Sequence, residues 1–187
     1  MLSKMLKMEI KYTTDYRNVK YPRLEFKTGD LLLVLPKEHH ESEGELIEKH
    51  KDWINNKHAQ IIAAMHNGRK KQLNMERDEE VFKDYVREMA AMYLKELKLN
   101  AESIRFRKMK SKWASCTIDG NITVNKLLRH LPNDLINYVI YHEVAHLKEK
   151  SHNHKFWNLV ENKFKNVNAK EKNLLTYWFL LQKQIKG

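Results

Sequence analysis

The chain has 187 residues, of which 42% are hydrophobic and 32% are charged, and its only cysteine is Cys116. This length supports a substantial core, and the apolar content is close to that of globular proteins. A single cysteine excludes an intrachain disulfide, and no apolar run is long enough to span a bilayer. Because segment 1–8 is broken by lysine and differs from a secretory signal, we expect a cytoplasmic protein.

Three short strands are predicted in the N-terminal part, where residues alternate in polarity before an apolar run. The second and third should pair as a hairpin through a turn at 28–30, within an antiparallel sheet. The predicted strands are 9–13, 23–27 and 31–35.

Two long helices are predicted next. The first runs from Ser42 to His66 and opens with a capping box formed by Ser42 and Glu45. The second runs from about 78 to 97, with apolar residues three or four positions apart. Its predicted apolar face consists of Val81, Tyr85, Val86, Met89, Met92, Tyr93 and Leu97.

A basic segment at 104–112 follows these helices and is predicted to begin as a strand. Five positive charges and no acidic residue lie between Arg105 and Lys112, with Phe106 and Trp113 interleaved. The net charge of the whole chain is +11, so this segment could contact phosphates of nucleic acid or a nucleotide. The alternative is an outward-facing basic strand edge that resists aggregation.

The most informative motif is His142-Glu143-Val144-Ala145-His146, within a predicted helix at 132–147. Residues four apart lie on one face of a helix, so both imidazoles can bind one metal ion. In this H-E-x-x-H pattern two histidines bind Zn²⁺ and the glutamate is the general base of a hydrolase. The surrounding helix is mostly apolar, and a metal would supply a partner for its three polar residues.

Two histidines do not complete a catalytic zinc site, which usually has three protein ligands and an open position. The short loop 148–151 can bring His152 back towards the pair, and His154 is a competitor for the same role. An Asp119-Gly120 turn before the motif predicts a hairpin whose return strand is 122–125, and two further helices should follow the motif.

The succession of motifs resembles the YgjP-like metallopeptidase family, relatives of the SprT-like and WLM proteases. It comprises Lys112-Trp113-Ala114-Ser115-Cys116, then Gly120-Asn121-Ile122-Thr123-Val124-Asn125, and then Tyr138 to Leu147. His152 and Phe156-Trp157 follow further along the chain. Ala114 departs from the glycine of the family pattern. The resemblance implies a zincin-like α+β fold, with small antiparallel sheets packed on several helices. We expect a single domain, 1–187, with strands and a long helix in 1–70 and the catalytic core in 75–187.

The resemblance further implies that His142, His146 and His152 bind Zn²⁺, that Glu143 is the general base, and that peptides or proteins are the substrates. Trp113 and Asn125 match family positions and are candidate substrate-binding residues. In such folds the substrate often lies along an edge strand, for which 104–112 and 121–125 are the candidates. Three alternatives stay open: a nucleoside triphosphate pyrophosphohydrolase, a DNA-associated protease, and an inactive metal-binding protein.

Overall fold

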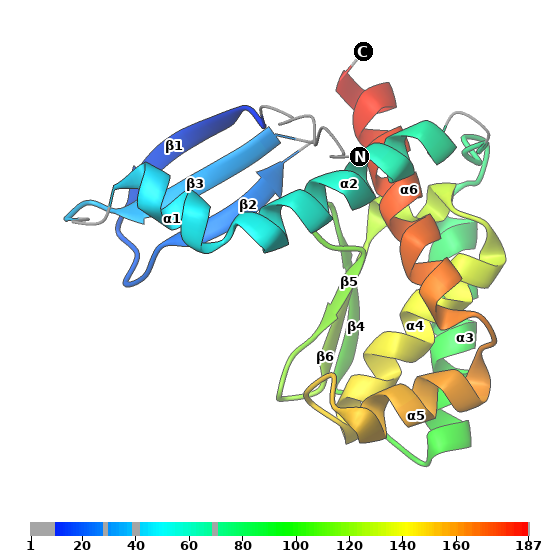
Figure 1. Cartoon of the computed structure of the whole chain (residues 1–187). Coiled ribbons are helices and arrows are strands. Elements are labelled where there is room, and N and C mark those ends of the chain that lie inside the picture. The colour runs from blue at the N-terminus through cyan, green and yellow to red at the C-terminus, as the bar shows by residue number, and fades with distance from the viewer. Residues whose placement is uncertain (1–9, 28–29, 39–41, 69–70, 187) are drawn as a thin grey trace, which may run out of the picture. The chain divides into compact units, whose positions relative to one another are not determined.

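The computed structural model describes residues 10–27, 30–38, 42–68 and 71–186. The chain divides into two compact units (Figure 1). Unit 1 contains residues 1–69 together with 178–187, and unit 2 contains residues 70–177. The fold is α+β, as the sequence predicted, with two small sheets and several helices in the described ranges.

Unit 1 contains a three-stranded sheet of β1 (Tyr12–Arg17), β2 (Arg23–Lys27) and β3 (Asp30–Pro36). The order is β1-β3-β2, so the third strand lies in the centre. The predicted antiparallel pairing of β2 with β3 is confirmed, but β1 pairs with β3 in parallel, and the prediction of a purely antiparallel sheet was wrong. Thr28 and Gly29 of the predicted turn lie outside the described residues.

The apolar sequence of β3 explains this strand order. Residues 31–35 of β3 are all buried, whereas β1 and β2 contain exposed polar positions. A strand that is apolar on both faces is most stable with neighbours on both sides. Leu31, Leu33 and Leu35 form the core of unit 1 with Leu46 of α1 (Glu43–Lys49) and Ile54 of α2 (Lys51–Gly68).

The helical segment of unit 1 differs from the prediction in one respect. The capping box between Ser42 and Glu45 is confirmed, but the predicted single helix is divided at His50 into α1 and α2. His50 has φ −110° and ψ 13°, outside helical geometry, although its carbonyl still accepts a bond from the Ile54 N–H at 3.0 Å.

Unit 2 contains a second sheet, of β4 (Ser103–Arg107), β5 (Ala114–Cys116) and β6 (Asn121–Asn125), in the order β4-β6-β5. The predicted hairpin of β5 and β6 is confirmed, and Gly120 supplies the turn with φ +84°. This sheet also is not purely antiparallel, because β4 pairs with β6 in parallel. The central position of β6 leaves it no free edge, which corrects the expectation that a substrate could lie along 121–125.

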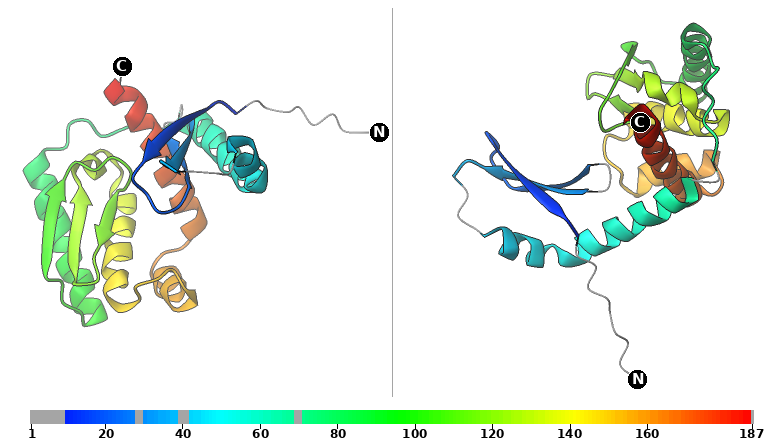
Figure 2. Two further views of the ribbon diagram at one scale, coloured as in Figure 1. Left: turned by 90° about the vertical axis from the view of Figure 1, so that its left-hand side faces the viewer. Right: turned by 90° about the horizontal axis from the view of Figure 1, so that it is seen from above.

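Helices cover one face of this sheet (Figure 2), and one of them carries the H-E-x-x-H motif. The sheet of unit 2 lies against α3 (Glu79–Leu97) and α4 (Asn133–Lys148), as the left view of Figure 2 shows. α5 (His154–Lys163) and α6 (Val167–Lys186) follow, and a short 3₁₀ helix, η1 (Lys126–His130), connects β6 to α4. None of the described helices has the length and hydropathy needed to cross a membrane.

Candidate metal and catalytic site

Helix α4 positions the H-E-x-x-H motif within the core of unit 2. It begins after Pro132, and residues Leu135, Ile136, Tyr138, Val139, Ile140, Tyr141, Val144 and Ala145 are buried. His142 and His146 are half-buried on this helix, with ring centroids 4.9 Å apart. The helix is therefore held on most of its surface, which fixes the direction of the two imidazoles.

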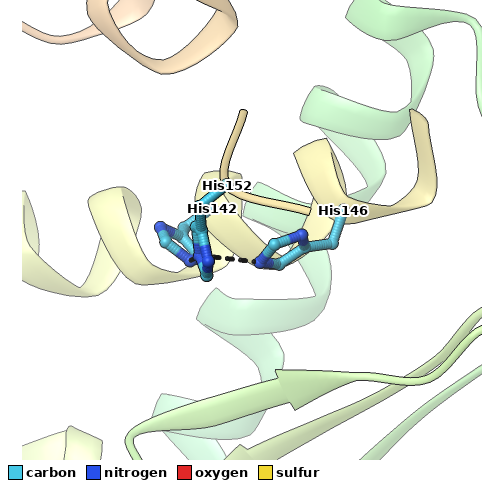
Figure 3. A group of neighbouring side chains, drawn as sticks. All are labelled: His142, His146 and His152. Carbon is cyan, nitrogen blue, oxygen red and sulfur yellow. Dashed lines mark hydrogen bonds between the residues drawn. The ribbon is translucent and has the colours of Figure 1, made fainter. Parts of the chain in front are cut away.

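His152 brings a third imidazole to the pair. Its Nε2 atom lies 3.0 Å from Nε2 of His142 and 3.1 Å from Nε2 of His146 (Figure 3). A tetrahedral zinc ion with bonds of about 2.0–2.1 Å holds its ligand atoms about 3.3 Å apart, close to these spacings. Three imidazole nitrogens that converge in this way fit the donor set of a divalent metal ion.

A backbone carbonyl determines which nitrogen of His146 is available. Nδ1 of His146 lies 3.0 Å from the carbonyl oxygen of Glu149. Because a carbonyl oxygen only accepts, Nδ1 carries the hydrogen, and Nε2 keeps its lone pair directed at the other two imidazoles. Metal-binding histidines commonly have such an outer hydrogen bond, which holds the ring in place.

The first turn of α5 holds the imidazoles from the other side. The ring of His146 stacks on Phe156, with centroids 4.5 Å apart, and the ring of His152 stacks on Trp157 at 5.6 Å. Asn153 caps α5 by accepting a hydrogen bond from the Phe156 N–H at 2.9 Å. Phe156 and Trp157 were not predicted to be site residues; the signal in the sequence was their position shortly after His152, at the start of an amphipathic helix.

The protonation of these residues suits metal binding. Burial, and then the neighbouring His146 and His152, lower the pKa of His142 to about 3. Burial is also the main cause that lowers the pKa of His146. The neutral form of both rings is therefore favoured, and only the neutral ring offers a nitrogen lone pair to a metal.

Glu143 lies one position further along α4 and is only 7% exposed. Burial raises the pKa of its carboxyl group to about 7, against the opposing influence of the Lys112 charge and a hydrogen bond from the Cys116 backbone N–H. A carboxylate with a pKa near neutrality can both take up and release a proton. Glu143 therefore has the chemistry of a general base beside the histidine cluster.

His154 is not part of this cluster. Among the described histidine, cysteine and acidic residues, the group with metal-binding geometry consists of His142, His146 and His152. His154 begins α5, and its Nδ1 atom lies 3.2 Å from Nδ2 of Asn158. The structure thus brings together the three histidines that the resemblance implied. His154, the alternative third ligand, does not belong to this group.

The side chain of Asn125, a candidate for substrate binding, is enclosed by the protein. Its side chain is fully buried at the end of β6, where Oδ1 accepts hydrogen bonds from the N–H groups of Met109 and Leu127. Its Nδ2 donates to the carbonyl oxygens of Met109 and Lys112, at 3.0 and 2.7 Å. All of its hydrogen-bonding capacity is used inside the protein, so Asn125 shapes the loop 108–113 instead of facing a substrate.

Trp113, the other candidate for substrate binding, is half-buried at the end of the same loop. Its Nε1 atom donates to the carbonyl oxygen of Leu174 in α6, at 3.3 Å. Its own carbonyl oxygen accepts from the Asn125 N–H at 2.8 Å. These bonds connect the loop to β6 and α6, and the substrate contact predicted for Trp113 stays a prediction.

Comparison with known proteins identifies the family. Residues 67–177 match the sequence profile of the YgjP-like metallopeptidase domain. The chain belongs to the YgjP-like metallopeptidase family. The matched region contains the whole H-E-x-x-H helix, the β5–β6 hairpin and the third histidine. This YgjP-like protein is therefore a metal-dependent hydrolase by family, and peptides or proteins are the substrates that the family implies.

Two solved structures are similar to this chain. The metallopeptidase zymogen of Pyrococcus abyssi abylysin is 28% identical, with 46% of this chain and 87% of that chain covered and a TM-score of 0.42. The metallopeptidase zymogen of Methanocaldococcus jannaschii jannalysin is 30% identical, with 53% of this chain and 96% of that chain covered and a TM-score of 0.43. A search of the curated proteins gave no match.

Proposed function

We propose that this protein is a zinc-dependent peptidase in which His142, His146 and His152 hold the metal and Glu143 is the general base. The observation that carries the proposal is the convergence of three imidazole Nε2 atoms, 3.0 and 3.1 Å apart for the two pairs that include His152. The buried carboxylate of Glu143 on the same helix completes the set of groups that metal-assisted hydrolysis requires.

The division of work among the residues follows from their chemistry. When bound, Zn²⁺ supplies Lewis acidity, which activates water and polarises a peptide carbonyl. Glu143 takes the proton from the attacking water and delivers it to the leaving amine as the peptide bond breaks. The Cys116 N–H, which donates to the Glu143 carboxylate, and the Lys112 charge keep part of this group ionised despite its burial.

The experiment that tests this proposal uses Glu143→Gln, which keeps the size of the side chain and removes the base. We expect the variant to bind zinc as the wild type does and to cleave peptides about 10²–10⁴-fold more slowly. Cleavage is measured by mass spectrometry on a mixture of denatured proteins. Glu161→Gln, an exposed glutamate of α5, is the matched control. Wild-type cleavage by Glu143→Gln would refute the role of Glu143.

Hydrolysis of nucleoside triphosphates is the other reaction that the basic segment suggested. The family match favours peptide bonds as the substrate. The wild type and Glu143→Gln also distinguish these two reactions. If the wild type released pyrophosphate and cleaved no peptide, and Glu143→Gln released no pyrophosphate, the protein would be a nucleotide hydrolase and the proposal would be wrong.

A further inference from the structure

A pocket of about 330 Å³ lies in unit 2, formed by one continuous stretch of chain, 107–112, together with Ser115 of β5. This stretch is most of the basic segment 104–112, and the proposed hydrolytic mechanism uses only the charge of Lys112 from it. Four of the residues in the pocket wall are cationic: Arg107, Lys108, Lys110 and Lys112. None of the described residues that line it is acidic.

Three of the four cations in this pocket have no carboxylate partner among the described residues. Within the described ranges, Arg107, Lys108 and Lys110 form no ion pair with a carboxylate, although cations elsewhere do so. Glu79, for example, pairs with Lys83, Lys126 and Arg129 at distances of 2.7–3.0 Å. Cations that line a concave surface without counter-charges attract an anionic ligand.

The loop that forms the pocket is held in shape from beneath. Asn125 is fully buried and fixes both backbone groups of Met109 and the carbonyl oxygen of Lys112. These hydrogen bonds hold the backbone of the loop in one conformation, so the lysines of the pocket extend from a fixed backbone.

The pocket adjoins the proposed catalytic residues. β5 packs against α4, and Ser115 of β5 lines the pocket while the next residue, Cys116, donates its N–H to Glu143. β5 is also an edge strand, because β6 covers only one of its sides. A peptide rises about 3.3 Å per residue when extended. A substrate side chain that enters this pocket would therefore belong to a residue within a few positions of the scissile peptide bond, which lies at Glu143.

We propose that this pocket binds an acidic side chain of the substrate, so that the enzyme selects peptides with aspartate or glutamate close to the scissile bond. The inference rests on the proposed peptidase function and names its substrate class. Exposed lysines each contribute a small attraction that salt screens. Three or four of them together should favour a glutamate-containing peptide over its glutamine counterpart by about tenfold at low salt.

Binding is measured first, on zinc-loaded Glu143→Gln so that nothing is cleaved. Two fluorescent peptides of equal length, one with three glutamates and one with three glutamines, are titrated by anisotropy at low and high salt. We expect the glutamate peptide to bind about tenfold more tightly at low salt, and the double charge reversal Lys108→Glu with Lys110→Glu to remove that preference. Lys165→Glu with Lys172→Glu, which makes the same change in net charge at two exposed lysines outside the pocket, is the matched control.

Three outcomes would overturn the inference. They are equal affinity for the two peptides, a preference that survives the charge reversal, and a single-stranded oligonucleotide that binds more tightly than the acidic peptide and loses its affinity in the same variant. The last outcome would make the pocket a nucleic-acid site. Circular dichroism checks that the charge-reversed chain is folded.

Cleavage by the wild-type protein is measured second, and it separates the two proposals. Cleavage of both peptides without a preference would remove the acidic selectivity and leave the peptidase. A preference in binding, with no cleavage of any peptide by the zinc-loaded wild type, would remove the peptidase and leave a cationic pocket that binds anions. Cleavage with a higher kcat/KM for the glutamate peptide supports both.

Discussion

The two units contain sheets of the same topology. In each, the first strand pairs in parallel with the third, the second pairs antiparallel with the third, and the third lies in the centre. The last paired positions also correspond, because Arg17 lies opposite Pro36 in unit 1 and Arg107 lies opposite Asn125 in unit 2. The candidate site belongs to unit 2, where helix α4 packs against β5 of the second sheet.

The difference lies in a few polar residues. Pro36 has no polar side chain, whereas Asn125 at the matching position holds the loop that forms the basic pocket. Arg17 is neutralised by Asp15 at 2.6 Å, whereas Arg107 has no carboxylate partner among the described residues. The two sheets thus share a topology and differ in the side chains at this last paired position.

The largest effect is expected when a histidine of the candidate metal site in unit 2 is replaced. We expect about one zinc per chain in the wild type and a large loss in His152→Ala, because two histidines do not hold a catalytic zinc firmly. His154→Ala, two residues away, and His58→Ala, in unit 1, should keep the metal. Inductively coupled plasma mass spectrometry on dialysed protein measures the content. Zinc retained in His152→Ala would mean that the third ligand lies elsewhere.

The second prediction concerns Asn125, the buried residue of β6 whose counterpart in the sheet of unit 1 is Pro36. Asn125→Ala leaves the backbone groups of Met109 and the carbonyl oxygen of Lys112 without their side-chain partner, and an unsatisfied polar group in the protein interior costs about 1–3 kcal/mol. We expect a loss of about 3 kcal/mol in the free energy of unfolding of unit 2. Urea unfolding followed by circular dichroism measures it.

Asn162→Ala, an exposed residue of α5, is the control for this measurement and should change little. If Asn125→Ala proves no more destabilising than Asn162→Ala, the hydrogen bonds of Asn125 do not set the difference between the two sheets.

A smaller effect is expected at the α5 cap. Asn153→Ala removes the hydrogen bond to the Phe156 N–H and should cost about 1 kcal/mol. Because Phe156 and Trp157 stack on His146 and His152, we also expect zinc to bind several-fold more weakly. Competition with a fluorescent chelator measures the affinity. Asn153→Asp keeps the cap and should behave as the wild type; an equal weakening in both variants would contradict a role for the cap.

Local spacing explains which features could be predicted from the sequence. The helix of the H-E-x-x-H motif, the capping box at Ser42 and the Gly120 turn each depend on residues within a few positions of one another. The position of β3 between its neighbours does not, because it depends on which of three strands is apolar on both faces. Strand order is decided by the core, and alternation of residues within one strand cannot reveal it.

The apolar face of α3 shows the same limit. Val86 and Tyr93 of the predicted face are buried, but Val81 is 64% exposed, and Phe82 and Ala90 complete the buried face in its place. Both versions of the face have helical spacing, and only the packing partner decides between them. The role of Asn125 was equally hidden, since its hydrogen bonds reach 13 and 16 residues back along the chain.

The last prediction concerns His130, which ends the segment directly after Asn125 and is 5% exposed. Its Nδ1 lies 2.9 Å from the carbonyl oxygen of Asn74, and its Nε2 accepts from Nε of Arg129 at 3.4 Å. This arrangement requires the neutral ring, because a proton on Nε2 would displace the Arg129 donor. Burial, assisted by the charges of Arg129 and Arg77, accordingly lowers the pKa of His130.

The sign of the pH effect follows from this lowered pKa. The unfolded chain, with an ordinary histidine pKa of about 6.5, takes up a proton before the folded chain does, so folding stability is lost as the pH falls below about 6.5. His130→Gln cannot be protonated and should lose less stability than the wild type between about pH 7 and pH 5. Urea midpoints of metal-free protein measure this, and the other histidines contribute equally to both chains. Identical slopes in the two chains would mean that the ring of His130 accepts its proton without leaving the folded state.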